Sequence, residues 1–125
     1  MGNLLDTGAA WFESMRVQFM TVPVTYCRDA AAVEVRATIG RTVFKVASEY
    51  GMFEKYISRD YIIAAGELLL NGEPILPARG DQIREIQGSK TYVYEVMAPG
   101  NDPCWRWSDS YRRSLRIHTK QVGEE

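Results

Sequence analysis

Apolar and polar residues alternate with period two along much of the chain after residue 21. The alternating apolar positions are Val22, Val24 and Tyr26 in a first run, Val33, Val35 and Ala37 in a second and, less regularly, Val43 and Val46. Side chains of a β-strand point alternately to the two faces of a sheet, so these runs predict half-buried strands. Turn signals at Arg28-Asp29 and at Gly40 separate them.

Four more strands are predicted further along the chain. They cover residues 61–64, 82–86, 91–97 and roughly 114–118. Asn71-Gly72 is a strong turn signal, and residues 66–70 before it are predicted to form a link with room for one helical turn. The strands 82–86 and 91–97 flank the Gly88-Ser89 turn and form the clearest predicted hairpin.

Residues 3–19 have the pattern of an amphipathic helix. Leu5, Phe12, Met15 and Phe19 lie on one face, and Pro23 prevents the helix from continuing far. This face either packs on its own barrel or docks in part on a neighbouring subunit. The predicted fold is mainly β (α+β): a small β-barrel or sandwich of about seven strands over residues 21–120 with an N-terminal helix, in a single domain of residues 1–125.

Composition narrows the function classes. Fifteen Lys and Arg residues against sixteen Asp and Glu residues give a formal charge of −1, which argues against avid, sequence-independent binding to duplex DNA. No apolar run approaches the length of a membrane span and the N-terminus lacks signal-peptide features, so we expect no membrane partner and synthesis in a reducing cytosol. Cys27 and Cys104 are far apart and read as isolated thiols.

Residues 47–57 lack a clean period and are predicted to form a loop. Tyr50, Met52, Phe53 and Tyr56 make this segment rich in aromatic and Met side chains. Such a cluster is either folded under the domain or reserved for a partner, because exposed patches of this composition mark interaction surfaces.

A second candidate surface lies near the C-terminus, where aromatic residues and arginines interleave. Its residues are Trp105, Trp107, Tyr111, Arg112 and Arg113. They can stack bases and hold phosphates, form a subunit contact, or simply cover the end of the barrel while the arginines stay solvated. All three interpretations remain open from the sequence.

The sequence predicts no enzyme. His118 is the single histidine, and Cys104 has no Gly-rich elbow beside it, so a Cys104–His118 dyad is a weak hypothesis; a satisfied strand histidine is the better reading. We expect no catalytic, metal or cofactor site, because one histidine and two distant cysteines cannot complete a zinc site and no phosphate loop is present. Arg79-Gly80-Asp81 reads as a turn and not as an adhesion motif.

Four stretches of the second half resemble the head–tail joining proteins of tailed phages and prophages, and more loosely the lambda-type ones. They are RDYIIAAGEL (59–68), NGEPI-x-P-x-RGDQI (71–83), Y-x-YEVMAPG (92–100) and WRWSDSYRR-x-LRIHTK (105–120). Residues 1–58 agree only in the order of their elements. Arg79, Gly80 and Asp81 match the turn before a strand, and Tyr92 and Val96 match positions in the strand after it.

The resemblance implies a structural virion protein, assembled in the bacterial host cytoplasm, that forms a homo-oligomeric ring in the head–tail connector. Its expected partners are a portal or adaptor ring and tail-tube or tail-terminator proteins, with DNA only as a passenger in the lumen. Residues 47–57 fall where the lambda-type proteins have a long flexible partner loop. The interface residues expected in this loop are therefore Tyr50, Met52, Phe53 and Tyr56. From the C-terminal surface, we also expect Trp105, Trp107, Arg112 and Arg113 at an interface. The alternative is a small nucleic-acid-binding barrel that uses the Trp and Arg surface.

Overall fold

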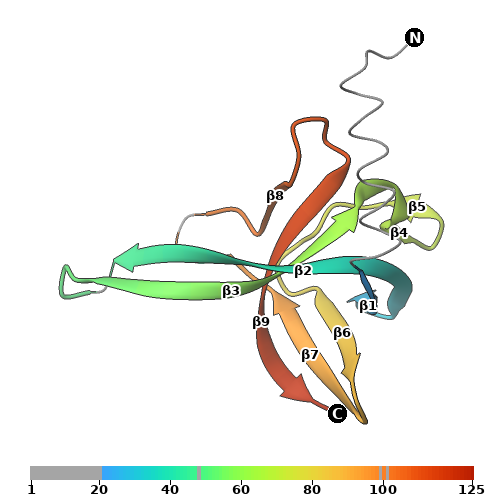
Figure 1. Cartoon of the computed structure of the whole chain (residues 1–125), viewed down its shortest axis with the longest axis horizontal. Coiled ribbons are helices and arrows are strands. Elements are labelled where there is room, and N and C mark those ends of the chain that lie inside the picture. Colours follow the sequence, from blue (N-terminus) through green and yellow to red (C-terminus); the bar gives the residue numbers. More distant parts are fainter. Residues whose placement is uncertain (1–20, 48, 99, 101) are drawn as a thin grey trace.

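The fold is built almost entirely of antiparallel strands (Figure 1). The computed structural model describes residues 21–125 with the exception of 48, 99 and 101. The predicted helix at 3–19 therefore lies outside the described residues. The elements are β1 (Val22–Arg28), β2 (Ala31–Ala47), β3 (Phe53–Ala64), the 3₁₀ turn η1 (Ala65–Glu67), β4 (Leu69–Leu70), β5 (Glu73–Pro74), β6 (Gln82–Gln87), β7 (Lys90–Val96), β8 (Trp105–Trp107) and β9 (Ser114–Glu124).

Six of these strands close into a barrel. The main sheet has seven strands in the order β3-β2-β1-β6-β7-β9-β8, and β9 also pairs with β3, which joins the two ends. Strand β8 lies outside the closed circle and, among the described residues, pairs only with β9. The predicted mainly β class is thus confirmed, and the choice between barrel and sandwich resolves to a closed barrel, which leaves fewer open sheet edges.

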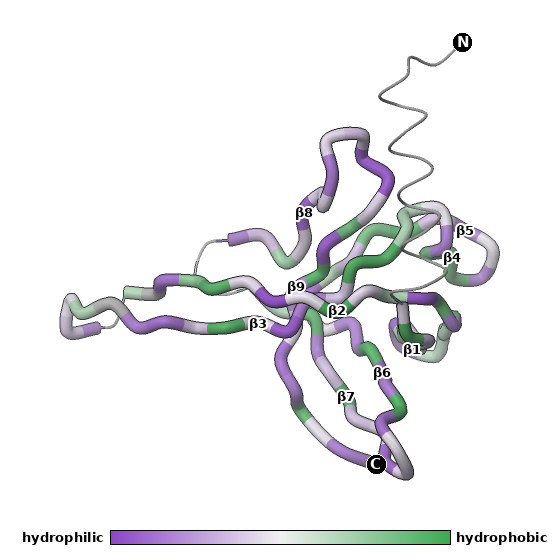
Figure 2. Tube along the Cα trace, in the orientation of Figure 1, coloured by the Kyte–Doolittle hydropathy of each residue, from purple (hydrophilic) through white to green (hydrophobic). Residues whose placement is uncertain are grey.

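Alternate side chains of each barrel strand fill the interior, as the period-two pattern predicted. The largest fully buried ones include Tyr26, Tyr61, Ile63, Ile83, Leu115 and Ile117. Leu68 and Leu70, from the segment between the barrel strands, belong to the same core cluster. Figure 2 shows the apolar stretches of these strands converging where the barrel strands cross.

The predicted turns after Arg28, at Asn71-Gly72 and at Gly88-Ser89 are confirmed, but the turn predicted at Gly40 is wrong. Strand β2 runs through Gly40, which pairs with Asp60 and leaves room for the Arg116 guanidinium. Asn71 and Gly72 have positive φ of 54° and 82°, the conformation of a two-residue hairpin turn, and join β4 to β5. Strands β6 and β7 pair in the predicted hairpin. The link before Asn71 contains the single 3₁₀ turn η1.

The C-terminal strand is longer than predicted. The sequence indicated a strand near residues 114–118 and a frayed tail, but β9 continues to Glu124, and Glu125 exchanges two backbone hydrogen bonds with Thr91, at 2.7 and 3.2 Å. The first half of β9 pairs with β3 and the second half with β7. The tail is ordered because it pairs along its length with β7.

The loop predicted at residues 47–57 is much shorter in the structure. Strand β2 runs to Ala47 and β3 begins at Phe53, so most of this segment is the outer part of a long β2–β3 hairpin. In Figure 1 the hairpin extends well beyond the barrel.

Candidate functional site

The outer half of the β2–β3 hairpin stands apart from the barrel. Strand β1 pairs with β2 only as far as Ala37, and β9 pairs with β3 only from Arg59 onward. Along residues 42–58 the two strands are therefore paired only with each other within the described part of the chain. We call this segment the arm. At about 3.3 Å per residue, its strands reach about 20 Å from the barrel.

One face of the arm carries apolar residues between pairs of cations. Residues that pair directly across two strands share a face. The pairs on this face are Arg41 with Arg59, Val43 with Ile57, and Lys45 with Lys55. The Arg41–Arg59 pair lies at the base of the arm, one step below its first strand pair. We call these six residues the Lys–Arg face of the arm.

The apolar pair at its centre is open to solvent. Val43 is 52 % exposed and Ile57 is 55 % exposed. An isolated two-stranded hairpin is marginally stable in water, and exposed apolar residues on it do not help it to fold. They mark a surface that a partner covers.

The charges on this face also indicate a surface that a partner covers. Like charges directly opposite each other destabilise a strand pair. Lys45 and Lys55 are both exposed, and neither forms an ion pair with any residue that the structure describes. An acidic partner surface would remove the repulsion between them.

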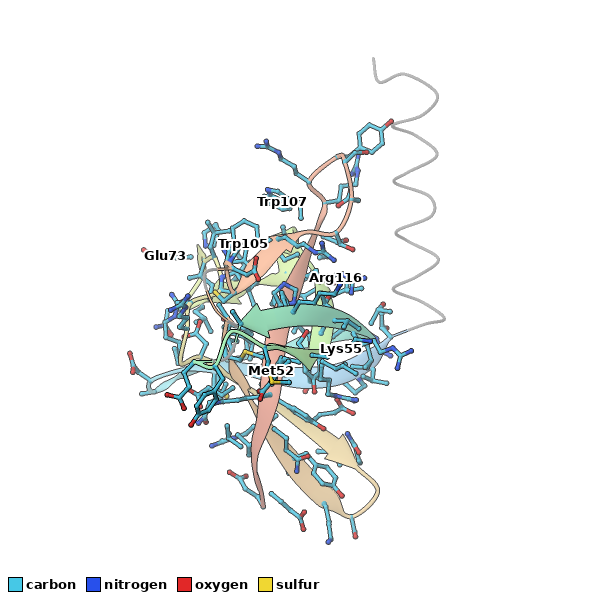
Figure 3. The ribbon with its side chains drawn as sticks, turned by 90° about the vertical axis from the view of Figure 1, so that its left-hand side faces the viewer. Met52, Lys55, Glu73, Trp105, Trp107 and Arg116 are labelled. Atoms are coloured by element: carbon cyan, nitrogen blue, oxygen red, sulfur yellow. The ribbon has the colours of Figure 1, made fainter. Side chains whose placement is uncertain are left out.

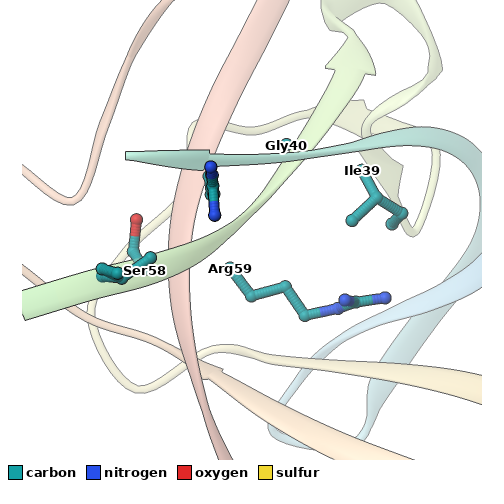
Figure 4. Close-up of a pocket in the computed structure, with 6 residues that line it drawn as sticks. Ile39, Gly40, Ser58 and Arg59 are labelled. Atoms are coloured by element: carbon teal, nitrogen blue, oxygen red, sulfur yellow. The ribbon is translucent and has the colours of Figure 1, made fainter. Parts of the chain in front are cut away.

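A shallow hollow of about 460 Å³ lies where the Lys–Arg face meets the barrel (Figure 4). It is lined by Ile39, Gly40, Arg41, Ile57, Ser58 and Arg59. The Arg59 side chain extends beneath Ile39 in this view. Its guanidinium donates to both oxygens of Glu85, at 2.9 and 3.1 Å, so this cation is held while the others remain available.

Two aromatic and sulfur side chains extend the surface at the tip of the arm. Tyr50 is 85 % exposed and Met52 is 69 % exposed. Figure 3 looks onto the tip, with Met52 and Lys55 in front of the barrel. Tyr56 lies on the opposite face from Lys55 and is half-buried, and burial raises the pKa of its hydroxyl.

A buried carboxylate holds the base of the arm to β9. Asp60 is fully buried and accepts hydrogen bonds from Thr42, from Ser58 at 2.5 Å and from Arg116 at 2.8 Å; His118 Nδ1 lies 2.9 Å from its Oδ1. Burial alone would raise the pKa of Asp60, but these hydrogen bonds, that from His118 foremost, lower it to about 2. The carboxylate is therefore charged and fully partnered, and it sets the position from which the arm projects.

The family of the chain can now be considered beside this geometry. The family model described as phage head-tail joining protein matches residues 2–125. The chain belongs to the phage head–tail joining family. A search of curated proteins gave no match. The resemblance seen in the sequence is thus confirmed, and the family supports a structural role in the phage virion.

For a head–tail joining protein, the first candidate surface takes an unexpected form. Tyr50 and Met52 lie in the short connection between the two strands of the arm, Tyr56 lies on β3, and Phe53 is the first residue of β3, opposite Ala47. The arm brings Tyr50 and Met52 to one exposed tip, while Tyr56 lies closer to the barrel. That these residues contact a partner stays a prediction.

The aromatic part of the second candidate surface is partly buried against the barrel core. The rings of Trp105 and Trp107 pack edge to face with centroids 5.2 Å apart, and both residues pack against the core cluster. This half-burial fits the interpretation in which the aromatic residues cover the barrel. Arg112 is exposed at the β8–β9 turn with φ of 57°, and the backbone N–H of Arg113 donates to Asp109 at 2.9 Å.

Cys104 and His118 lie close in the fold but their side chains have other partners. The backbone N–H of His118 donates to the backbone carbonyl of Cys104 at 2.9 Å. The Cys104 thiol belongs to the core and contacts the Pro77 carbonyl at 3.7 Å, whereas the His118 ring contacts Asp60. Burial raises the pKa of the thiol, which disfavours the nucleophilic thiolate.

The Arg79-Gly80-Asp81 turn is part of the scaffold, as predicted. Asp81 is 5 % exposed and accepts from Tyr26, from Arg28 at 2.8 and 3.0 Å and from the Ala78 N–H at 3.0 Å. Burial would raise the pKa of Asp81, but the hydrogen bonds, with that from Arg28 first, lower it below the ordinary value. Gly80, at φ of 92°, makes the turn possible.

Two further findings concern groups in the described part of the chain. It contains no helix long and apolar enough to cross a membrane. It also contains no group of three or more His, Cys, Asp or Glu residues placed to hold a metal ion.

The sequence did not reveal the Lys–Arg face. Its four cations and two apolar residues come from two strands, and they share a face only because of the pairing register. The available signal was the charge pattern Arg41, Lys45, Lys55 and Arg59 around a β-rich segment, which becomes informative once a hairpin is assumed.

Proposed function

We propose that this chain is a ring-forming subunit of the head–tail connector, which completes the filled head and provides the surface on which the tail docks. The membership of the phage head–tail joining family supports a virion role. The arm supports a role in assembly, because it exposes apolar and cationic side chains that do nothing for the stability of a lone subunit.

In this proposal the barrel is a rigid body and the arm contacts the partner proteins. The partners are further copies of the chain, a portal or adaptor ring on one side and tail-tube or tail-terminator proteins on the other. DNA passes through the lumen as a passenger, and the protein acts as a structural component and not as an enzyme. The observation that carries the proposal is the projecting arm in a member of this family.

Electron microscopy of the full-length protein with the purified portal ring of the same phage tests the proposal. We expect an added ring of density on the portal. The variant Tyr50→Ser with Met52→Ser should reduce ring occupancy at least tenfold, because it removes the two most exposed apolar side chains of the tip.

The matched control is Ile86→Ser, which removes a 74 % exposed apolar side chain from β6 of the barrel. It should leave ring occupancy unchanged. If the wild-type protein adds no density to the portal and forms no ring alone at high concentration, the proposal is wrong.

A further inference from the structure

The corner of the molecule around β4 and β5 has the opposite charge to the Lys–Arg face of the arm. Residues 65–78 contain Glu67 and Glu73 but no lysine or arginine. Both glutamates are exposed, and neither forms an ion pair with another described residue. We call residues 65–78 the β4–β5 corner.

The corner also exposes apolar side chains. Leu69 is 38 % exposed and Leu76 is 54 % exposed. Leu69 pairs directly with Pro74, so these two apolar residues share a face of the small β4–β5 sheet. Glu73 pairs with Leu70, on the other side of this sheet, and remains exposed next to the turn. The corner thus offers exposed apolar and acidic side chains within one short segment, which complement the apolar and cationic side chains of the Lys–Arg face.

The corner is rigid enough to act as a docking surface. Leu68 and Leu70 are buried in the core, and the Ile75 N–H donates to the Leu68 carbonyl at 3.1 Å. The positive φ of Asn71 and Gly72 fixes the turn between the strands. Docking of a partner here would therefore cost little conformational entropy in the corner.

The arm and the corner of one chain cannot meet. In Figure 1 the arm extends to the left of the barrel, whereas β4 and β5 lie on its right-hand side. In Figure 3, which looks at the arm tip, Glu73 lies well away from Lys55. Two complementary surfaces on opposite sides of one molecule make a heterologous contact, which repeats from copy to copy and closes into a ring when the rotation permits.

We propose that the Lys–Arg face of the arm docks on the β4–β5 corner of the adjacent copy of this chain. Lys45 and Lys55 pair with Glu67 and Glu73 of the neighbour, while Val43 and Ile57 cover Leu69 and Leu76. The partner contact removes the repulsion between Lys45 and Lys55 and buries the exposed apolar pair. This inference rests on the proposed ring and names the surfaces that form it.

Zero-length cross-linking between amines and carboxylates tests the contact directly. Full-length chains, one half labelled with ¹⁵N, are mixed, assembled on the portal ring or at high concentration, and treated with a carbodiimide. Mass spectrometry should find peptides that join Lys45 or Lys55 to Glu67 or Glu73, with one labelled and one unlabelled member. Cross-links from these lysines only to other acidic residues would overturn the inference.

Charge reversal separates this inference from the proposed function. Lys45→Glu with Lys55→Glu should weaken self-association at least tenfold in sedimentation velocity, and Glu67→Lys with Glu73→Lys should do the same. The control Lys90→Glu with Lys120→Glu makes the same change in net charge on exposed barrel positions and should leave self-association unchanged.

The outcomes are distinct. If rings form and the arm reversal leaves them intact, the inference is wrong while the proposed function stands. If the arm reversal spares self-association but abolishes binding to the portal, the arm serves a different connector protein and the inference is likewise overturned. If the wild-type chain forms no ring under either condition, the proposed function itself fails.

Discussion

The barrel and the arm of this molecule differ in the burial and pairing of their charged and apolar side chains. In the barrel, Asp81 and Glu85 are buried and bound by arginine and tyrosine side chains. On the arm, Lys45 and Lys55 face each other without a described counter-ion, beside an exposed Val43–Ile57 pair. A folded subunit does not need such a surface. The difference indicates that the barrel secures the fold and that the arm is built for contact.

Asp60 joins the two regions. It receives hydrogen bonds from both strands of the hairpin and from β9, and so determines the direction of the arm. The comparison between barrel and arm predicts that substitutions differ in effect according to where they fall, from this buried joint to the exposed tip.

The largest effect on stability should come from Asp60→Asn. The amide cannot replace a carboxylate that is bound to Arg116 and contacted by His118, so a buried charged network loses its centre. We expect a loss of about 3 kcal/mol in the free energy of unfolding, measured by urea denaturation. Glu124→Gln, which removes the exposed pair with Lys90, should change it by less than about 0.5 kcal/mol.

A smaller loss should follow Asp81→Asn in the turn before β6. This carboxylate accepts charge-assisted hydrogen bonds from Arg28, which is partly exposed and can turn to water when they are lost. We expect about 2 kcal/mol by the same measurement. Arg79→Ala, two residues away and exposed, should cost under about 0.5 kcal/mol; an equal effect of the two substitutions would contradict the scaffold role of the turn.

Acid should weaken the barrel in a defined range. The pKa of Asp60 falls from the ordinary 3.8 to about 2 on folding, and that of Asp81 is also lowered. A carboxylate with a lowered folded pKa stabilises the protein above its unfolded pKa and loses this contribution as pH falls toward the folded value. For Asp60 the loss should be on the order of 2 kcal/mol between about pH 5 and pH 2.

Urea midpoints measured at several pH values in that range check this dependence. In Asp60→Asn the slope of stability against pH should be shallower, since one of the two responsible groups is absent. An unchanged slope would show that the carboxylate does not titrate as described.

The smallest effect on the fold should come from the arm. Val43→Ser with Ile57→Ser removes two side chains that are already more than half exposed, so the free energy of unfolding should change by less than about 1 kcal/mol. Assembly on the portal should nevertheless be lost. A large loss of stability would mean that the arm supports the barrel and is not reserved for a partner.

The strands that could be predicted from the sequence are those with one face in the barrel. Val22, Val24 and Tyr26 alternate because one side of β1 meets the core and the other does not. The arm was not predicted, for a related reason. It has no core on either side, so apolar residues such as Val43 and Phe44 follow one another on opposite faces and no period emerges.

The joint at Asp60 was also out of reach of sequence reasoning. Its partners Thr42, Arg116 and His118 come from three strands, and only the register of β2, β3 and β9 brings them together. The satisfied histidine was predicted, but not the carboxylate that satisfies it. The Trp105–Trp107 pair shows the converse: residues conspicuous in the sequence as a candidate surface pack in large part on the core.

The most direct test of the account mixes two charge-reversed proteins. One carries Lys45→Glu with Lys55→Glu and has two acidic surfaces; the other carries Glu67→Lys with Glu73→Lys and has two basic ones. If the arm binds the corner of its neighbour, neither protein should form rings alone, and an equimolar mixture should form rings of alternating subunits, counted by electron microscopy. Rings from either protein alone, or none from the mixture while wild-type rings form, would contradict the account.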